Sequence, residues 1–426
     1  MPTSYFNSPV AAHDLRPVEK SMTRRTHRIC DPQETLDWLM PKLSPMGITR
    51  LSDITGLDRI GIPIAQAVRP LGRSLSVSQG KGLTLTASLV SAGMEAAETW
   101  HAEFPVVDTV TTTAASLAEG EAVAPLGDLA VSAPKRTNMD QVRMQWTEAW
   151  DLLTETPIWV PMDCVHMDFT RDAETRFLSR SSNGLASGNT PDEAIAHGLL
   201  EVIERDCIAD FKAMAETARR KRRINPEHVA NADPALATLL ERIHRADVNL
   251  EIWDITNDLS VPAFMAQVFE LGSPSNGMLG APVPKPSAGY GCHLDPITAL
   301  IRAITEAVQS RLTSIAGSRD DLPPRRYDPA PEGNISNMMN RIMDQVQFGY
   351  QALNTRDQST HKTDGDVACL LDRIAWAGVG HVAVVNLSRE EIGIPVFRII
   401  APGMSLNFPR GFHLGTRHLG RRGITV

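Results

Sequence analysis

One stretch, residues 182–205, constrains this chain more than any other. It begins as a loop of small and polar residues that ends in Gly188-Asn189-Thr190, and such small residues let a backbone approach a ligand closely. Thr190 is typical of a helix N-cap, Pro191 of the first helical position, and Glu193 completes a capping-box pattern. We therefore expect a helix from Pro191 to the end of this stretch, directly after a glycine-containing loop.

The predicted helix carries a stripe of ionisable side chains. Four of them fall within about 80° of one another around the helix axis: Glu193, His197, Glu201 and Glu204. A stripe of this kind is usually a solvated face, but here apolar residues border it and cover the opposite side, which indicates burial. Buried carboxylates are costly unless cations or hydrogen bonds meet them. Oxygen ligands suit a hard cation such as Mg²⁺, and a glycine-containing loop before a helix suits phosphate.

The same arrangement recurs upstream and downstream. The run 78–84 precedes an upstream helical segment, and the run 289–296 precedes a downstream one. The paired positions fall in register in the three units: Glu95/Glu98, Glu201/Glu204 and Glu306/Gln309. Their first members are separated by 106 and 105 residues. Matched loops, caps and acid pairs predict three related units that converge on one site for a polyanion.

These residues resemble the YcaO-domain family, whose members use ATP to activate backbone amides of peptides. The resemblance extends from about Arg50 to Met404 and is most specific in three runs: 78–98, 182–205 and 306–311. Three further runs resemble the subgroup that is encoded beside a TfuA partner and implicated in thioamide formation: 55–63, 310–313 and 392–396. The resemblance, and not the spacing, points to ATP and to a peptide amide.

This resemblance implies an ATP–Mg²⁺ site built from the repeated units. The expected Mg²⁺ ligands are Glu95, Glu98, Glu201 and Glu204, with Glu193 as a fifth candidate. The expected nucleotide-binding residues are Lys81, Ser91, Glu193, Arg205, Glu306, Gln309 and Arg311. In the implied reaction the amide oxygen attacks the γ-phosphate, and a sulfur or hydroxyl nucleophile then displaces phosphate. No catalytic residue separate from the nucleotide site is expected, because this route requires no protein nucleophile.

The resemblance leaves the product open. Azoline-forming cyclodehydratases of the family usually end in a proline-rich tail, which residues 417–426 lack. Together with the TfuA-type runs, this favours a thioamide in a ribosomally made peptide or protein, as in bacteriocin biosynthesis, with a TfuA-like partner. Azoline formation and a non-catalytic nucleotide-binding scaffold are the alternatives. A di-metal oxidase is a further rival because Glu98 and His101 form an ExxH pair, but that chemistry needs four core helices.

Composition bounds the partners and the compartment. The net charge of −8 argues against nucleic acid as the main partner. The five cysteines are scattered and odd in number, which favours free thiols in a reducing cytoplasm. The chain has no signal-peptide pattern and no apolar run of about 18 residues, so we expect a cytoplasmic protein without a membrane segment. A homodimer is the default expectation for a soluble homo-oligomer.

Strand signals occur along the whole chain between the predicted helices. We therefore expect an α+β fold, YcaO-like by resemblance, with antiparallel or mixed sheets. Residues 250–255 and 261–268, for example, are predicted to be neighbouring strands. Near the N-terminus a short helix should begin at Pro32 and end at Pro41, because proline cannot donate the next helical hydrogen bond.

These assignments divide the chain into three segments. They are an N-terminal tail with a first helix (1–45), a catalytic domain (46–405) and a C-terminal tail (406–426). The basic run 24–28 is expected to be a solvated patch of the N-terminal tail. The run 318–332 has a length usually found in lids or docking loops.

Overall fold

The structure is a computed structural model that describes residues 19–20, 28–129, 138–175, 177–270, 285–319, 321–322, 356–408 and 411–421. Within these residues the named strands pair antiparallel in four sheets, and helices pack between and around them. This arrangement confirms the predicted α+β class. All five cysteines are free, as expected.

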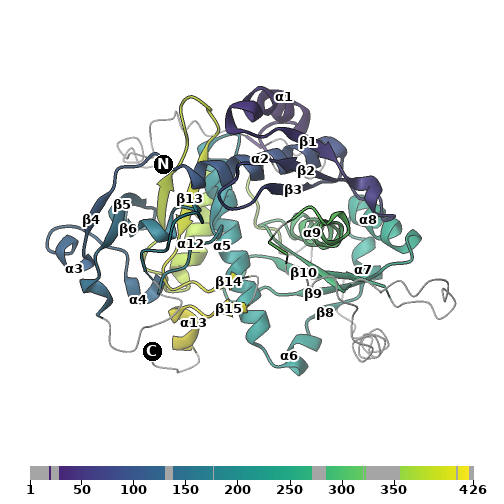
Figure 1. The fold of residues 1–426 in the computed structure, drawn as a ribbon. Coiled ribbons are helices and arrows are strands. Elements are labelled where there is room, and N and C mark those ends of the chain that lie inside the picture. The colour runs from purple at the N-terminus through teal and green to yellow at the C-terminus, as the bar shows by residue number, and fades with distance from the viewer. Residues whose placement is uncertain are drawn as a thin grey trace.

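Two sheets of similar width lie on one side of the molecule, to the right in Figure 1. The first has the order β1-β2-β3, with β1 at Arg50–Asp53, β2 at Ile64–Val68 and β3 at Val77–Lys81. The second has the order β11-β10-β9-β8, with β8 at Arg223–Ile224, β9 at Asn249–Asp254, β10 at Ala263–Phe269 and β11 at Ser287–Cys292. Strands β9 and β10 are the neighbouring pair predicted from the sequence.

The largest sheet lies on the other side and has the order β4-β5-β12-β13-β7, with β6 paired to β5. Its strands are β4 at Val110–Thr112, β5 at Met144–Asp151, β6 at Thr156–Pro161, β7 at Leu185–Ser187, β12 at Ala383–Asn386 and β13 at Val396–Ile400. A small sheet near the C-terminus pairs β14, Leu406–Phe408, with β15, Gly411–His413.

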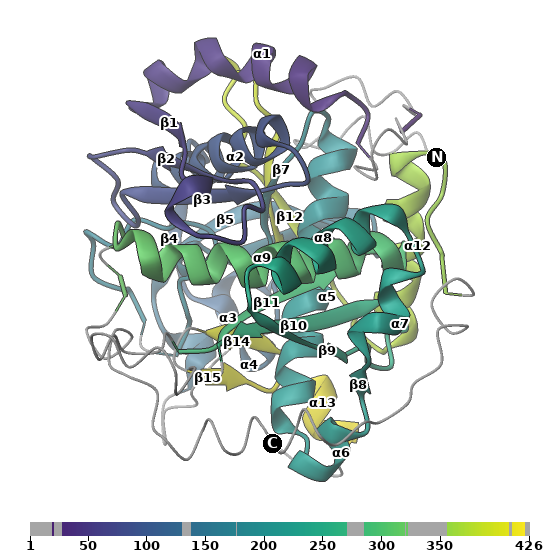
Figure 2. The same cartoon turned by 90° about the vertical axis from the view of Figure 1, so that its right-hand side faces the viewer.

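The longest helices are α2 at Leu85–Glu103, α5 at Pro191–Ala213 and α9 at Pro296–Ala316. The other α-helices in the described residues are α1 at Pro32–Leu43, α3 at Ala114–Leu117, α4 at Leu126–Leu129, α6 at Glu216–Arg220, α7 at Pro226–Ala230, α8 at Pro234–Arg245, α12 at Thr363–Trp376 and α13 at Thr416–Arg421. Helix α5 runs through the middle of the molecule, and α9 lies between the β1–β3 sheet and the β8–β11 sheet (Figures 1 and 2).

Each of the three long helices follows a strand through a short turn, which confirms the three predicted units: β3–α2, β7–α5 and β11–α9. Thr84, Thr190 and Asp295 are the N-caps, and each side chain accepts a backbone N–H of the first turn. Glycine lets strand and helix approach closely in two units. A Cβ on Gly80 would lie 2.0 Å from the backbone nitrogen of Ala92, and one on Gly289 would lie 2.0 Å from that of Ala307.

Two helix boundaries differ from the predictions. Helix α5 continues eight residues past Arg205, with its apolar faces buried in the main core, and ends at Ala213. Pro41 lies inside α1, which ends at Leu43. The prediction for Pro41 was wrong because Leu39 and Leu43 pack against α2, where Gly93 leaves room for Leu39. That packing outweighs the loss of one helical hydrogen bond near the helix end.

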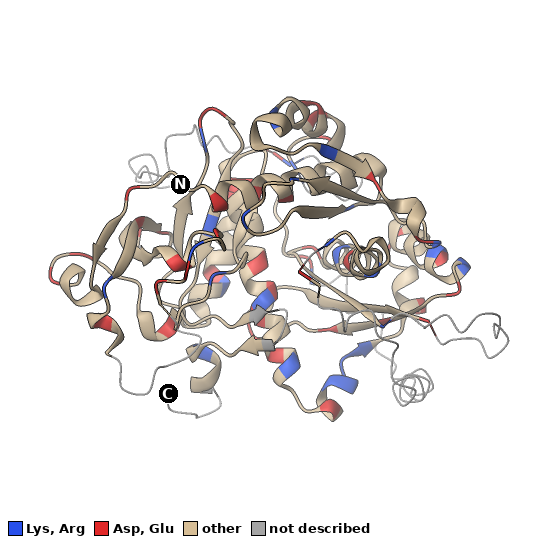
Figure 3. Cartoon of the chain, in the orientation of Figure 1, with Lys and Arg blue, Asp and Glu red and all other residues tan. Residues whose placement is uncertain are grey.

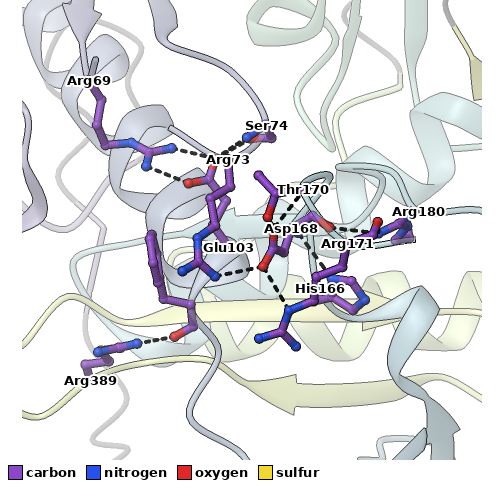
Figure 4. A network of polar contacts seen from close by, with 11 residues as sticks. Arg69, Arg73, Ser74, Glu103, His166, Asp168, Thr170, Arg171, Arg180 and Arg389 are labelled. Carbon is purple, nitrogen blue, oxygen red and sulfur yellow. Dashed lines mark hydrogen bonds and ion pairs between the residues drawn. The ribbon is translucent and has the colours of Figure 1, made fainter. Parts of the chain in front are cut away.

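A polar network fixes the C-terminal end of α2 against the loops that precede β3 and β7 (Figure 4). Buried Glu103 binds both terminal nitrogens of Arg69, at 2.6 and 2.7 Å, and also accepts from Ser74. Arg73 and Arg171 share the carboxylate of Asp168. The network therefore holds α2 in a fixed position beside the loop that leads into β7.

Both predicted tails contact the core where the structure describes them. Lys20 forms a buried ion pair with Asp366 on α12, with Nζ 2.6 Å from Oδ2. At the other end, Arg417 on α13 pairs with Asp206 and Asp258. Most of the predicted docking run 318–332 lies outside the described residues. Of the helices that the structure describes, none has the length and apolar character of a membrane-spanning segment.

Candidate functional site

Lys81, at the end of β3, and Glu306, on α9, join two of the three units. Lys81 Nζ lies 2.9 Å from Glu306 Oε2, and the other carboxylate oxygen accepts the backbone N–H of Tyr290 at 3.2 Å. Both side chains keep limited solvent access, 19% for Lys81 and 26% for Glu306. This pair is therefore partly open to a ligand.

The middle of α5 supplies a second charged group to the same region. Arg205 lies between two carboxylates, 3.1 Å from Glu201 and 3.3 Å from Glu204. Acidic positions outnumber basic ones along this helix (Figure 3). The neighbouring cation satisfies only part of the negative charge, because one guanidinium serves two carboxylates.

Helix α2 contributes carboxylates that have no cation partner among the described residues. Glu98 Oε1 accepts the backbone N–H and the hydroxyl of Ser187 on β7, at 2.8 and 2.7 Å. Glu95, one turn earlier, forms no ion pair with a described residue. Its neighbour Ser91, also partly buried, forms no hydrogen bond through its side chain there. Glu98 thus joins the β3–α2 unit to the β7–α5 unit.

The electrostatic coupling between these acids shows that the three units converge. Burial raises the pKa of Glu95 to about 6, with further contributions from the charges of Glu306 and Glu201 and opposing ones from Arg319 and Lys81. Burial likewise raises the pKa of Glu98 to about 8 and that of Glu204 to about 7. Each of these carboxyls also senses acids on another helix, so α2, α5 and α9 meet at one place.

Glu306 behaves differently from the other acids. Burial would raise its pKa, but Lys81 and Arg205 hold it below the usual range. Glu306 is therefore ionised near neutral pH. Glu98 and Glu204, with pKa values of about 8 and 7, retain protons there to a large extent, whereas Glu95, at about 6, is mostly ionised. Protons therefore neutralise part of the surplus of carboxylates in this ligand-free site, and a bound cation would favour their ionised forms.

The donor set suits Mg²⁺, which prefers carboxylate oxygens and water. Across the part of the chain that the structure describes, no three His, Cys, Asp or Glu side chains are preassembled around a common metal position. Ionised carboxylates repel one another, and a bound cation would offset that repulsion. The four predicted ligands, Glu95, Glu98, Glu201 and Glu204, lie in one coupled cluster and fit the ion in type.

Two predicted nucleotide-binding residues on α9 have partners outside this cluster. Gln309 donates to the backbone carbonyl of Gln79 at 2.8 Å. Arg311 is bound to Asp58 at 3.0 Å and to Glu270 at 2.6 Å. Both side chains thus link α9 to other parts of the fold, Gln309 to β3 and Arg311 to Asp58 and Glu270.

Glu193 has partners that the sequence did not indicate. Its backbone N–H donates to Thr190, but its carboxylate does not complete the predicted capping box. It instead accepts from Arg28 at 2.6 Å and from Asn189 at 3.2 Å. Thr35 Oγ1 lies 3.0 Å from Asn189 Oδ1. Arg28 is therefore not the solvated residue that we expected, and residues 24–27 lie outside the described residues.

Arg302 is a further cation that sequence reasoning missed. It lies on α9 one turn before Glu306, and its Nη2 is 3.4 Å from Nε2 of His197 on α5. Burial lowers the pKa of His197 well below its usual range, with contributions from Arg28, Arg302 and Lys81. The position of Arg302 four residues before Glu306, on the same helix face, is the signal that could have identified it.

Within the described residues, His101, the second member of the ExxH pair, forms no hydrogen bond or ion pair with these acids. It is fully buried, and its Nδ1 lies 2.7 Å from the carbonyl of Ala97. Burial lowers the pKa of His101 to about 4. His101 thus has a backbone partner on its own helix, whereas Glu98 binds Ser187 on β7.

Comparison with known proteins identifies the family. A family model described as "YcaO cyclodehydratase, ATP- and Mg²⁺-binding" matches residues 79–405. A protein of Rhizobium leguminosarum bv. trifolii, known as an uncharacterized protein in the tfuA 3′ region, is 35% identical over 408 residues, or 95% of each chain.

Two solved structures share the fold. A heterocyclase in complex with substrate and cofactor superimposes with a TM-score of 0.76 at 22% identity; the match covers 96% of this chain and 57% of that longer one. The YcaO protein of Methanopyrus kandleri, bound with AMPPCP and Mg²⁺, gives a TM-score of 0.67 at 22% identity and covers 93% and 98% of the two chains. The family model, the relative and the three converging units agree, and this chain belongs to the YcaO family of ATP- and Mg²⁺-binding proteins.

Proposed function

We propose that this protein uses ATP to phosphorylate a backbone amide oxygen of a ribosomally made peptide or protein, on the way to a thioamide. The observation that carries the proposal is the coupled cluster of carboxylates from α2, α5 and α9, in contact with Lys81 and Arg205. A cluster with this surplus of buried negative charge is stabilised by divalent cations, and those cations in turn hold a triphosphate.

The residues fall into two groups in this proposal. Carboxylates of α2 and α5 hold Mg²⁺: Glu95, Glu98, Glu201 and Glu204. Cationic and hydroxyl side chains at the rim bind the nucleotide: Arg28, Lys81, Ser91, Arg205 and Arg302. Bound Mg²⁺ supplies neutralisation of the triphosphate charge. Glu193 orients Arg28, and Glu306 orients Lys81, through the ion pairs already formed in the structure.

The proposed reaction proceeds in two steps, phosphorylation of the amide oxygen and its replacement by sulfur. The amide oxygen takes the γ-phosphoryl group of ATP, and ADP leaves. Hydrosulfide then adds to the activated carbon, and the former amide oxygen departs within inorganic phosphate, leaving C=S. The protein residues bind and orient the reactants, since neither step needs a nucleophilic side chain.

We further propose that a TfuA-like protein supplies the sulfur step. The relative from R. leguminosarum is known by its position in the tfuA 3′ region, and this likeness extends over 95% of both chains. The sequence runs that resemble the TfuA-associated subgroup point the same way.

The test is mass spectrometry of a candidate peptide co-expressed with this protein and a TfuA-like partner. The expected product is a peptide in which one sulfur atom has replaced one oxygen atom. Loss of one water would instead identify azoline formation. ADP release by purified protein with peptide and partner separates an enzyme from a scaffold, and an unmodified peptide without ADP release would refute the proposal.

A further inference from the structure

Gln309 stands in register with Glu98 and Glu204, yet it is an amide. A carboxylate only accepts hydrogen bonds when ionised, whereas a carboxamide also donates two. In the structure Gln309 uses this capacity, because its Nε2 donates to the backbone carbonyl of Gln79 at 2.8 Å. The break in the acidic pattern thus coincides with a contact that an ionised glutamate could not make.

Thr313, one turn further along α9, contacts the side chain of Gln79, whereas Gln309 contacts its backbone. Its hydroxyl bonds the side-chain carbonyl of Gln79 and also lies 2.7 Å from the carbonyl of Gln309. Gln79 is 1% exposed, so these contacts are shielded from water. We name Gln309 and Thr313 together the α9 clamp.

The clamp acts on β3, which is the edge strand of the β1-β2-β3 sheet. An edge strand leaves part of its backbone without a strand partner, and Gln309 satisfies one such carbonyl. Gly80 faces α2, because a Cβ built on it would meet the α2 backbone. Since side chains alternate along a strand, Gln79 and Lys81 both face the opposite way, toward α9. Figure 2 shows α9 running alongside this sheet.

Gln79 precedes Lys81 by two residues on the same face, and Glu306 precedes Gln309 by one turn of the same helix. The two contacts, Gln79–Gln309 and Lys81–Glu306, are therefore successive rungs between β3 and α9. The first rung is neutral and involves the buried residue Gln79, and the second is charged and partly exposed. A long, flexible lysine depends on its backbone anchor for its position, and small displacements of such a group are costly for phosphate binding.

We propose that Gln309 and Thr313 are positioning residues that fix Lys81 opposite Glu306 by holding Gln79, where the β3–α2 and β11–α9 units meet. This inference rests on the proposed nucleotide site and assigns to Gln309 a role other than nucleotide contact. It also explains why the third unit carries one carboxylate where the other two carry a pair.

The experiment measures the affinity for Mg²⁺ with a non-hydrolysable ATP analogue by calorimetry in full-length variants. Gln309→Met keeps the volume and removes the donor, and we expect about fivefold weaker binding, the typical effect of one buried neutral hydrogen bond. Gln309→Glu should weaken binding at least as much at a pH where its carboxyl is ionised, because a carboxylate then faces a carbonyl. A metal-ligand role predicts the reverse, with Glu equal to or tighter than wild type.

Thr313→Val and Thr305→Val form a matched pair. Both threonines are buried on α9 and bond the carbonyl four residues earlier, but Thr313 alone reaches Gln79. We expect about twofold to threefold weaker binding for Thr313→Val and unchanged binding for Thr305→Val. Equal effects of the two substitutions would overturn the inference.

A double-mutant cycle separates positioning from general stabilisation. If the clamp acts through Lys81, Gln309→Met has no further effect on affinity in a Lys81→Met background. Additive effects, or full affinity in Gln309→Met with only a lower melting temperature, would overturn the inference while leaving the proposed function intact. Absence of nucleotide binding by the wild-type protein would overturn both.

Discussion

Helices α2 and α5 differ from α9 at the second position of the acid pair. On α2 and α5 this position holds a carboxylate, and the pKa values of Glu98 and Glu204 are raised. On α9 it holds an amide, and the single acid, Glu306, is kept ionised by Lys81 and Arg205. Three units related by pattern therefore need not repeat one role. Two units concentrate negative charge, and the third supplies a compensated acid and a scaffold.

Removing an acid from α5 should have the largest effect on activity. It tests the role assigned to the carboxylates of α2 and α5. Glu201→Gln should lower ATP consumption by about 100-fold or more, because a charge that faces the phosphates' counter-ions is lost. The measurement is ADP release with peptide and partner present. Glu241→Gln, an exposed acid of α8 paired with Arg245, is the control and should match wild type. Activity of Glu201→Gln within a few-fold of wild type would refute its assignment.

Removing a charge from the scaffold side of α9 should affect stability instead. Arg311→Met leaves Asp58, whose side chain is 4% exposed, without its cation, so we expect a loss of about 3 kcal/mol in the free energy of unfolding. The KM for ATP should not change well below the melting temperature. Urea unfolding and steady-state kinetics check the two parts. A raised KM with unchanged stability would indicate that Arg311 binds the nucleotide.

The protonated acids of α2 and α5 predict how the stability of the ligand-free protein depends on pH. The folded-state pKa values of Glu95, Glu204 and Glu98, about 6, 7 and 8, exceed the ordinary value of 4.5. The folded state therefore binds protons that the unfolded chain releases. This contribution is fully present below pH 4.5 and is lost as the pH rises through 6 to 8.

We expect a loss on the order of 5 kcal/mol between about pH 5.5 and 8.5, measured by urea unfolding without Mg²⁺. Mg²⁺ with an ATP analogue should remove most of the slope, because cations favour the ionised acids. Glu98→Gln should reduce the slope in the absence of Mg²⁺, most clearly near pH 8. A stability that rises over this range and does not respond to Glu98→Gln would contradict the burial of these acids.

A smaller effect is expected at the N-terminal arm. Arg28→Met should raise the KM for ATP about tenfold, the effect expected when one partly exposed charge–phosphate contact is lost. Lys20→Met, on the same arm but paired with Asp366, should lower stability and leave the KM unchanged. Equal KM values for the two variants would remove Arg28 from the nucleotide site.

Local signals accounted for the parts of the fold that were predicted. Thr84, Thr190 and Asp295 cap their helices because capping depends on residues two or three positions apart. The register of the three acid pairs was equally visible, since it needs only the helical period. These features identified the three units and the members of the central cluster from the sequence alone.

The contacts that could not be predicted join residues far apart in the chain. Arg28 meets Glu193 across 165 positions, and Gln309 meets Gln79 across 230. No periodicity encodes such contacts. Pro41 was misjudged for a related reason, because the packing of α1 on α2 overrides a local helix-breaking signal.

A crystal structure with Mn²⁺ in place of Mg²⁺ and a non-hydrolysable ATP analogue, read by anomalous scattering, would test the convergence of the three units on one nucleotide. We predict metal peaks within coordination distance of carboxylates from both α2 and α5, with Lys81 and Arg205 facing the phosphates. Peaks confined to one helix, or a nucleotide bound away from Glu95, Glu201 and Glu306, would contradict that convergence.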